Sequence, residues 1–324
     1  MAFTKDVLKI DPEAISAKLV DFIRDAVLNR YRRKGIVIGL SGGIDSSVSA
    51  ALSVKALGRE RVVGLLLPEK DSNPISREYG KLVADALGIE CHEINLTPML
   101  ETFHVYEKRD AIVKKLFPDL NPPFKFRLVL PQDLLDRDRL NVYHIEVLLP
   151  DGNVRKERVP HGDYLELMAA NDIKQRLRMT QLYYEAERRH YIVCGTTNYP
   201  ELIQGFYVKY GDGGVDIEPL AYLYKAQVFA LGAHLGVSDA VLKRTPSPDT
   251  YSFPVSDQDF YFCMPYEILD YVIYGVEHGL PNAEVAAALG LTADQVARAA
   301  KDLVRKREAT AMLREMAPTV EFKF

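Results

Sequence analysis

Short apolar runs alternate with helical segments through the first hundred residues, and this alternation constrains the fold more than any other feature of the sequence. Each helical segment is long enough to cross from one buried strand back to the next. Such an order predicts a doubly wound, mostly parallel α/β sheet with helices on both faces, as in a Rossmann-like fold. Strands are expected over 36–40, 61–69 and 90–96, and helices over 11–33, 48–58 and 76–88.

Residues 104–165 interrupt the alternation. Two runs of alternating apolar and polar residues flank Asp151 and Gly152, a pair that is typical of a two-residue hairpin turn. The sequence therefore predicts an α/β core with a β-rich insertion and a helical C-terminal segment. The expected boundaries are 1–103 and 166–264 for the core, 104–165 for the insertion and 265–324 for the C-terminal segment.

The charge balance and the spacing of the cysteines indicate which classes of protein the chain does not belong to. The chain of 324 residues has 41 basic and 45 acidic side chains and a formal net charge of −4, without the basic excess of a nucleic-acid-binding surface. Its three cysteines lie far apart, and no apolar run approaches the ~18 residues of a membrane span. We therefore expect a cytoplasmic protein that binds neither nucleic acid nor a membrane.

One segment keeps a nucleic-acid function open. Residues 282–303 contain two short helical patterns on either side of Gly290, as in a helix-turn-helix. The second pattern has few basic residues at its start, where a recognition helix contacts DNA. A helical pair that packs on the core is the more common explanation of such a pattern.

The segment 39–47, GLSGGIDSS, follows the first predicted strand and allows two interpretations. Its first five residues fit the G-x-S-x-G elbow of the α/β-hydrolases, in which Ser41 is a nucleophile. An elbow serine normally follows several strands, whereas this segment follows the first one. The alternative is a phosphate-binding turn, because its glycines permit close backbone approach and the next helix begins with unpaired N–H groups. We favour the phosphate-binding turn.

Asp45 adds a second constraint to this segment. A carboxylate among phosphate ligands repels the substrate unless a cation lies between them, and Mg²⁺ prefers such oxygen ligands. Asp45 therefore indicates a magnesium-bound phosphate. The Gly-Lys-Ser/Thr of a Walker loop does not occur here, so that class of nucleotide-binding protein is excluded. A tight strand-to-helix turn with a capping aspartate is the structural alternative.

SGGIDSS after a first strand resembles the pyrophosphate-binding loop, or PP-loop, of the N-type ATP pyrophosphatases, which belong to the adenine nucleotide alpha hydrolase-like superfamily. Residues 195–228 resemble one segment of the NAD synthetases, with Gly-Thr-x-Asn, a Glu, Gly-Phe, Lys-Tyr-Gly-Asp-Gly, Pro-Leu and Lys in the same order and spacing. Residues 173–179 and 236–249 resemble two further segments of that family. The chain thus resembles the ammonia-dependent NAD synthetase family.

The resemblance implies an ATP-dependent, AMP-forming amide ligase. The carboxylate of deamido-NAD attacks the α-phosphate of ATP with Mg²⁺, pyrophosphate leaves, and ammonia displaces AMP from the acyl adenylate. In physical terms, Lys209 offers a point charge, Asp212 can accept a proton from ammonium, and Arg244 can neutralise the leaving pyrophosphate.

The resemblance also assigns each site residue a role. The implied catalytic residues are Lys209, Asp212 and Arg244, and the implied metal ligands are Asp45 and Glu201. The implied ATP-binding residues are Gly39, Ser41, Gly42, Gly43, Asp45, Ser46, Ser47 and Thr196. The implied binding residues for the acid substrate are Lys174, Arg178, Asn198 and Lys225. Lys174 and Arg178 are four residues apart and should share one face of their helix, whereas Arg176 should point elsewhere.

Several positions depart from the family pattern. Asp172 stands where the family usually has Asn, Val208 replaces a Thr, and Pro248 and Thr250 alter the loop that contains Arg244. The ATP-binding positions agree better than those expected to contact the acid. A related amide ligase that joins another carboxylic acid to ammonia or an amine therefore stays open, as does a non-catalytic nucleotide sensor. The insertion is expected either to reshape the acid pocket or to form a dimerisation patch.

The nitrogen source is expected to be free ammonia, an amine or a separate nitrogen-delivering partner. Glutamine-using members of the family carry an additional amidase domain, and a chain of 324 residues has no room for one. No cysteine lies in a glutaminase-like setting. By analogy with the family, the protein is expected to be a homodimer.

Overall fold

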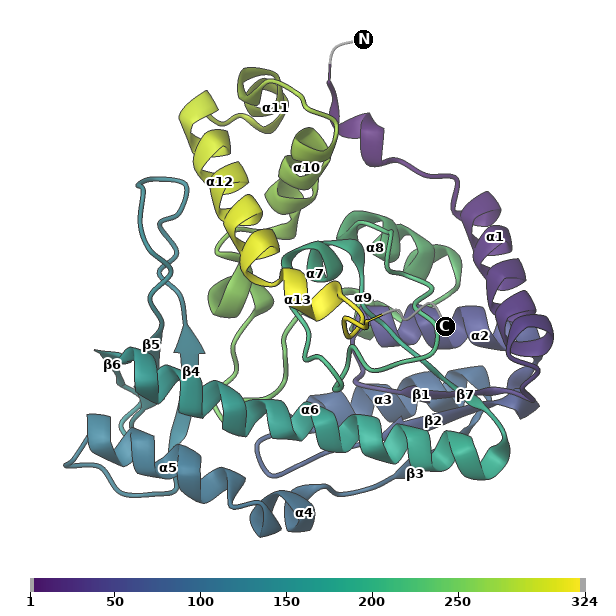
Figure 1. Ribbon diagram of the computed structural model, residues 1–324, viewed down its shortest axis with the longest axis horizontal. Helices are drawn as coiled ribbons and strands as arrows, with labels where there is room; N and C mark the ends of the chain where they lie inside the picture. Colours follow the sequence, from purple (N-terminus) through teal and green to yellow (C-terminus); the bar gives the residue numbers. More distant parts are fainter. Residues whose placement is uncertain (1–2, 321–324) are drawn as a thin grey trace.

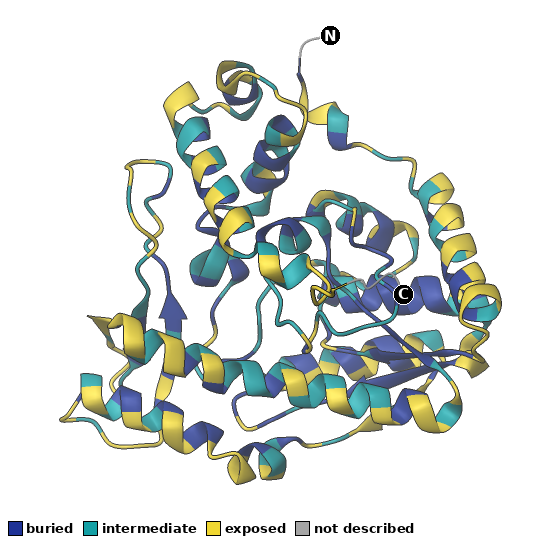
Figure 2. Ribbon diagram, viewed as in Figure 1, coloured by how far each residue is buried: buried dark blue, intermediate teal, exposed yellow. Residues whose placement is uncertain are grey.

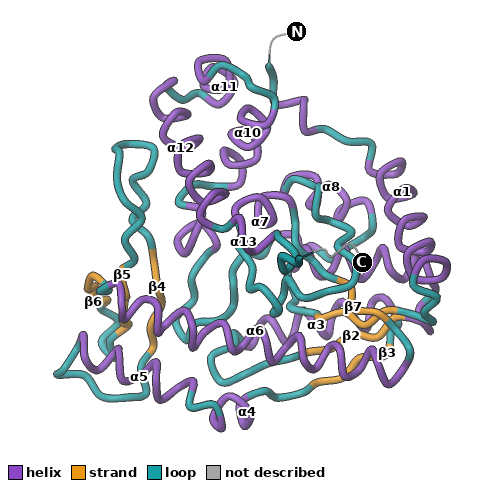
Figure 3. The backbone as a smooth tube through the Cα atoms, in the orientation of Figure 1, coloured by secondary structure: helices purple, strands orange, loops and turns teal. Residues whose placement is uncertain are grey.

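The computed structural model of the chain describes residues 3–320 and contains two separate sheets (Figures 1 and 3). The larger sheet has four parallel strands in the order β3-β2-β1-β7. Because β1 pairs with β2 on one side and with β7 on the other, the chain winds in both directions from β1. The predicted doubly wound parallel fold is confirmed. The strands are β1 (Ile36–Gly39), β2 (Val62–Leu66), β3 (Glu90–Glu93) and β7 (Ile192–Cys194).

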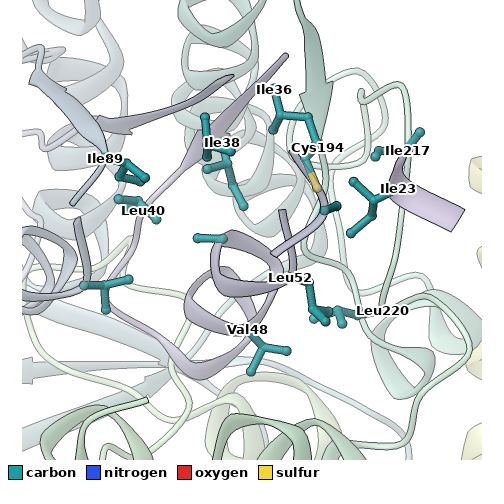
Figure 4. Packing of buried hydrophobic residues seen from close by; sticks show 14 of the residues in the cluster. Ile23, Ile36, Ile38, Leu40, Val48, Leu52, Ile89, Cys194, Ile217 and Leu220 are labelled. Atoms are coloured by element: carbon teal, nitrogen blue, oxygen red, sulfur yellow. The ribbon is translucent and has the colours of Figure 1, made fainter. Parts of the chain in front are cut away.

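Helices cover both faces of this sheet because β1, β2 and β7 are apolar on both sides. Ile36 and Ile38 of β1 point to one face, and Val37 points to the other. Figure 4 shows the first of these two cores, in which strand residues pack against helix α2. The helices on that face are α1 (Pro12–Asp25), α2 (Ile44–Leu57), α3 (Pro74–Leu87) and α8 (Lys225–His234), and those on the other are α4 (Thr97–Thr102), α5 (Val105–Leu116) and α6 (His161–Arg189).

Helix α2 is the most deeply buried of these helices, as Figure 2 shows. Helix α1 begins where the sequence predicts, because Asp11 accepts hydrogen bonds from the backbone N–H groups of Glu13 and Ala14. The predicted helix over 11–33 is not uniform. It continues past α1 as a π-helical segment, and short 3₁₀ turns occur elsewhere. These irregular segments are the π-helical Ala26–Arg30 and Gln258–Phe262 and the 3₁₀ turns Lys5–Leu8 and Arg59–Arg61.

The second sheet lies within residues 104–165 and is antiparallel, in the order β4-β5-β6. Strands β5 and β6 form the hairpin predicted around Asp151, and Gly152 takes the left-handed conformation that the turn needs, with φ 85°. The same stretch also contains α5, which packs on α6. The division of the chain into core and insertion stays a prediction. The strands are β4 (Lys125–Val129), β5 (His144–Leu148) and β6 (Val154–Arg158).

Helix α6 connects the two sheets. Leu167, in its first half, packs in the core of the antiparallel sheet, and Ala186, near its end, packs against the parallel sheet. The C-terminal segment is helical, as predicted, and its helices pack on one another and on α7. In residues 3–320 no helix is both long and apolar enough to cross a membrane. The remaining helices are α7 (Tyr199–Gln204), α9 (Asp239–Leu242), α10 (Tyr266–Glu277), α11 (Asn282–Leu289), α12 (Ala293–Ala309) and α13 (Ala311–Arg314).

Candidate active site

A cavity of about 470 Å³ lies at the carboxyl ends of the parallel strands. Its wall includes the segments that directly follow β1, β2 and β7, together with the side of α6 and the loops around Lys209 and Arg244. This is the edge of a doubly wound sheet at which ligands bind, because the polar strand ends and the helix N-termini meet there. The volume is within the range of small-molecule sites.

The loop after β1 forms one end of the cavity. Gly42 has φ 68°, and a Cβ atom there would lie 2.7 Å from the Ser76 carbonyl oxygen, so the position requires glycine. The hydroxyls of Ser46 and Ser47 donate to the Gly43 carbonyl at 3.1 and 2.7 Å. No side chain caps the N-terminus of α2. Its first N–H groups therefore face the cavity as a site for an anion.

Ser41 lies in this loop beside another serine. Its Oγ is 3.1 Å from the Ser46 Oγ. A nucleophilic serine needs a general base within hydrogen-bond reach. The loop geometry therefore supports phosphate binding for Ser41 rather than nucleophilic attack.

Asp45 and Glu201 are brought together, as predicted for a pair of metal ligands. Lys225 Nζ lies 2.6 Å from Asp45 Oδ2 and 3.6 Å from Glu201 Oε1. Asn198 Nδ2 donates to Asp45 Oδ1 at 3.0 Å and to Glu201 Oε1 at 2.6 Å. The two carboxylates, which lie at the ends of different parallel strands, thus share one ammonium and one amide.

Local sequence positions these side chains. Asn198 is the N-cap of α7 and forms a capping box with Glu201, which fixes the direction of the Glu201 side chain. Lys225 begins α8, and the carboxylate of Asp270 accepts hydrogen bonds from the backbone N–H groups of Lys225 and Ala226 at 3.3 and 2.8 Å. The backbone at both positions is therefore fixed.

Asp257 is a third acid at this place, and sequence reasoning missed it. It is buried, lines the cavity and accepts a hydrogen bond from the Tyr266 hydroxyl at 3.0 Å. The only signal in the sequence was a segment, 255–262, that matches the family loosely. We call Asp45, Glu201 and Asp257 the carboxylate cluster.

The carboxylate cluster has more negative than positive charge. Burial raises the pKa of Glu201 well above its ordinary value, and Lys225 only partly offsets this. Burial also raises the pKa of Asp257 to about 6. Burial lowers the pKa of Lys225, but the carboxylates of the cluster outweigh burial and raise it. These shifts indicate a site that can accept a further cation.

The fit to Mg²⁺ can be judged from the oxygens present. Two carboxylates converge on one cationic group, as the ligands of a divalent ion do. Within residues 3–320, no group of three or more His, Cys, Asp or Glu side chains is arranged to hold a metal ion. A cation at Asp45 and Glu201 therefore depends on further oxygens, such as those of a nucleotide phosphate, which Mg²⁺ commonly uses.

The three predicted catalytic residues line the cavity together with Thr196. Lys209 Nζ donates to the carbonyls of Met312 and Glu315 at 2.7 and 3.0 Å. Asp212 Oδ1 accepts from the Val208 N–H at 2.9 Å, and burial raises the pKa of Asp212 to about 6.

Arg244 lies at the phosphate-loop end of the cavity. It donates to the Ser41 carbonyl at 2.9 Å and to the Ser76 hydroxyl at 2.5 Å. Its guanidinium group is thus placed next to the loop that was predicted to bind phosphate.

The helical spacing of α6 did not predict which side chains reach the cavity. Arg176 and Arg178 line it, whereas Lys174 is buried elsewhere. Lys174 Nζ lies 2.9 Å from Glu69 Oε1 and 2.8 Å from Asp71 Oδ2. Asn198 is also fully buried and does not line the cavity itself. It donates hydrogen bonds to Asp45 and Glu201, which do.

Aromatic side chains form part of the wall of the cavity. Tyr143, which precedes β5, stacks on Tyr164 of α6 with ring centroids 4.8 Å apart. Phe206 stacks on Tyr261 at the same centroid distance of 4.8 Å. Two aromatic residues of the predicted insertion, Tyr143 and Tyr164, therefore contribute to the cavity. All four residues line it.

The parallel sheet has an uncapped glycine-rich loop after an interior strand, and the carboxylate cluster lies next to this loop. Together these features define a nucleotide-binding α/β enzyme of the PP-loop type. The family model for NAD synthase matches residues 15–122 and 140–311. The chain therefore belongs to the NAD synthase family. As a member of this family, it is an ATP-dependent ligase.

Individual proteins agree with this assignment. The chain is 42% identical over 313 residues to the NH(3)-dependent NAD(+) synthetase of Rhizobium meliloti, with 97% of this chain and 93% of the relative covered. It is similar to the structure of NMN synthetase from Francisella tularensis, with a TM-score of 0.67, 25% identity and coverage of 97% and 100%. The NH3-dependent NAD synthetase from Campylobacter jejuni has the same fold, with a TM-score of 0.62, 22% identity and coverage of 97% and 100%.

Proposed function

We propose that this protein is an ammonia-dependent NAD synthetase. ATP is its cosubstrate. The carboxylate of deamido-NAD attacks the α-phosphorus of ATP, the bond to the β-phosphate breaks, and pyrophosphate leaves. The nitrogen of ammonia then attacks the acyl carbon of the adenylate, and AMP departs. The observation that carries the proposal is that the phosphate loop, the carboxylate cluster and the predicted catalytic residues all line one cavity.

The phosphate loop and Arg244 serve the first step. The N–H groups at the start of α2 bind phosphate oxygens, and Arg244 lies beside them through its bond to the Ser41 carbonyl. Its guanidinium neutralises charge on the leaving pyrophosphate. Asp45 and Glu201 hold Mg²⁺, which when bound neutralises phosphate charge. The fit of these two carboxylates to one shared cation supports this role.

Asp212 serves the second step. Ammonium must lose a proton before its nitrogen can attack an acyl group, and a base with a pKa near the working pH accepts that proton well. The pKa of Asp212, raised by burial to about 6, is suited to this task. Lys209, which also lines the cavity, supplies a positive charge near the acyl group.

The aromatic residues of the cavity support a flat ring as part of the acid substrate. Tyr164 and Phe206 are among them, and aromatic faces stack on planar heterocycles such as a pyridine ring. We assign the acid substrate to these aromatic residues and ATP to the phosphate loop. Arg178 and Lys225 line the same cavity.

The direct test measures AMP, pyrophosphate and NAD formed from ATP, Mg²⁺, ammonium and deamido-NAD. We expect all three products in equal amounts. Nicotinate mononucleotide should be assayed in parallel, because the same chemistry would convert it to NMN. AMP release with that acid alone would keep the activating step and refute the proposed acid. No AMP release with any acid would refute the proposal.

The nitrogen source and the assembly are further parts of the proposal. Glutamine in place of ammonium should give no NAD with the purified chain, and a nitrogen-delivering partner would appear as activity restored by cell extract. We propose a homodimer by analogy with the family, to be tested by light scattering. The three cysteines are free, which supports a reducing compartment such as the cytoplasm.

A further inference from the structure

The ammonium of Lys225 occupies a defined place inside the carboxylate cluster. It lies 2.6 Å from Asp45 Oδ2 and 3.6 Å from Glu201 Oε1, and the side chain is 1% exposed. The ring of Tyr266 covers it, with its centroid 5.0 Å from Nζ. The ammonium is therefore enclosed by the same carboxylates that are proposed to hold Mg²⁺.

An ammonium and a metal ion cannot both take the position between Asp45 Oδ2 and Glu201 Oε1. Mg²⁺ binds carboxylate oxygens at about 2.1 Å. An ion on Asp45 Oδ2 at that distance would face an ammonium that is 2.6 Å from the same oxygen. Two cations at such close range repel each other strongly in a buried site. Binding of the metal therefore requires Lys225 to move.

The surroundings of Lys225 allow this movement without a change in the fold. Lys225 begins α8, where its backbone N–H donates to the Asp270 carboxylate. Its side chain ends at the cavity proposed to receive the nucleotide. The carboxylate cluster offers three carboxyl groups to the single ammonium of Lys225, and all four side chains line the cavity. A divalent ion supplies more positive charge than the ammonium that it displaces.

We propose that Lys225 is a placeholder cation. In the nucleotide-free protein its ammonium takes the position between Asp45 and Glu201 that the metal takes with ATP. It leaves that position when metal and nucleotide bind together. Metal without nucleotide therefore binds weakly, because it must displace the Lys225 ammonium and no phosphate is present to bind the displaced ammonium. This inference rests on the metal role proposed above for Asp45 and Glu201.

The first experiment titrates Mn²⁺ into the full chain without nucleotide and follows free Mn²⁺ by electron paramagnetic resonance. The variants are Lys225→Met and, as a matched control, Lys174→Met, which removes an equally buried lysine next to two acids. Coupling between two bound groups commonly changes affinity ~5-fold to ~150-fold. We expect Lys225→Met to bind Mn²⁺ at least ~10-fold more tightly than the wild type.

The control variant should bind Mn²⁺ no better than the wild type, because Arg109 still pairs with Asp71 there. Two results would overturn the inference. One is equal Mn²⁺ affinity in the wild type and in Lys225→Met. The other is a gain of affinity in Lys174→Met as large as that in Lys225→Met.

A second measurement does not depend on whether Lys225→Met folds. A crystal structure of the wild type with Mn²⁺ and α,β-methylene-ATP should show the metal on Asp45 and the ammonium no longer within hydrogen-bond distance of Asp45 Oδ2. An ammonium that stays there with metal bound would refute the placeholder role. Failure of the proposed function would instead appear as wild-type protein that releases no AMP with any acid.

Discussion

Lys174 and Lys225 are both almost completely buried, and their surroundings differ in charge balance. Lys174 contacts Glu69 and Asp71, and Arg109 pairs with Asp71 and with the partly exposed Asp110, so the two buried acids meet two buried cations. We call this set the balanced network. Lys225 alone faces the three acids of the carboxylate cluster. Both lysines are 1% exposed, so burial by itself does not separate them.

The acids of the two sets respond to this difference in opposite directions. Burial raises the pKa of Glu69, but the Lys174 ammonium, the Asp71 backbone N–H and the Arg178 guanidinium together outweigh burial, and the pKa is lowered. The pKa of Glu201 is raised, because one ammonium cannot offset burial and two neighbouring acids. The balanced network holds the segment after β2 to α6 and to the Thr250 carbonyl. An unbalanced buried cluster at a cavity is the one that calls for a ligand.

We expect the largest change in the free energy of unfolding from a substitution in the balanced network. Lys174→Met leaves Glu69 and Asp71 with only Arg109, and loss of one partner from a buried ion pair costs about 3–5 kcal/mol. We expect the free energy of unfolding in urea to fall by that amount and Mg²⁺ not to restore it. Recovery of stability with Mg²⁺ would break the distinction between the two lysines.

The pH dependence of stability should reveal the carboxylate cluster. The pKa of Asp257 is about 6 in the folded protein, above its value of about 4 when unfolded, so the folded state binds more protons between these values. Stability due to this group is present below about pH 4 and is lost as the pH rises to about 6. Asp257→Asn should remove that loss. Relative to the wild type, its free energy of unfolding should rise by about 2–3 kcal/mol from pH 4 to pH 7.

That difference is measured by urea denaturation at several pH values. A constant difference between the two proteins across this range would show that Asp257 has an ordinary pKa. The cluster would then carry less excess charge than its burial indicates.

A matched pair of substitutions tests whether a buried acid stabilises the balanced network and destabilises the carboxylate cluster. Glu69→Gln removes a charge from the balanced network and should lower the free energy of unfolding by about 1–3 kcal/mol. Glu201→Gln removes a charge from the carboxylate cluster and should leave stability unchanged or raise it. The second variant should lose AMP-forming activity. Equal destabilisation by both substitutions would contradict the comparison.

The smallest effect on stability is expected at the hairpin of the antiparallel sheet, whose turn residues belong to neither ionic set. Gly152 has φ 85° with no atom within 4 Å of an added Cβ. Gly152→Ala should therefore cost about 1 kcal/mol through backbone strain alone. The KM for ATP should not change. A changed KM would link the hairpin turn to the nucleotide site.

The fold and the glycine-rich loop after β1 could be predicted because their determinants are local. Strand and helix periodicities, the Asp11 cap and the glycines after β1 each act within a few residues. The resemblance to the NAD synthetases was confirmed by the family match.

The placement of Lys174 and Asp257 could not be predicted from local patterns. The Lys174 side chain points toward two acids that lie more than 100 positions away in the sequence. The spacing of residues on one helix face could not predict these partners. Asp257 reaches Lys225 only because the loops after α9 pack across the cavity. The roles of individual site residues stay predictions until variants are measured.

The contact between Lys209 and the end of α13 has a consequence for the order of synthesis. The ribosome makes the glycine-rich loop after β1 early, and the sheet is complete once β7 has emerged. The two carbonyls that hold the Lys209 ammonium come from Met312 and Glu315, which lie 103 and 106 positions after Lys209 in the sequence. A nascent chain in which the parallel sheet is already complete therefore still lacks these two carbonyls. The position of the Lys209 side chain is fixed only after both residues have been translated.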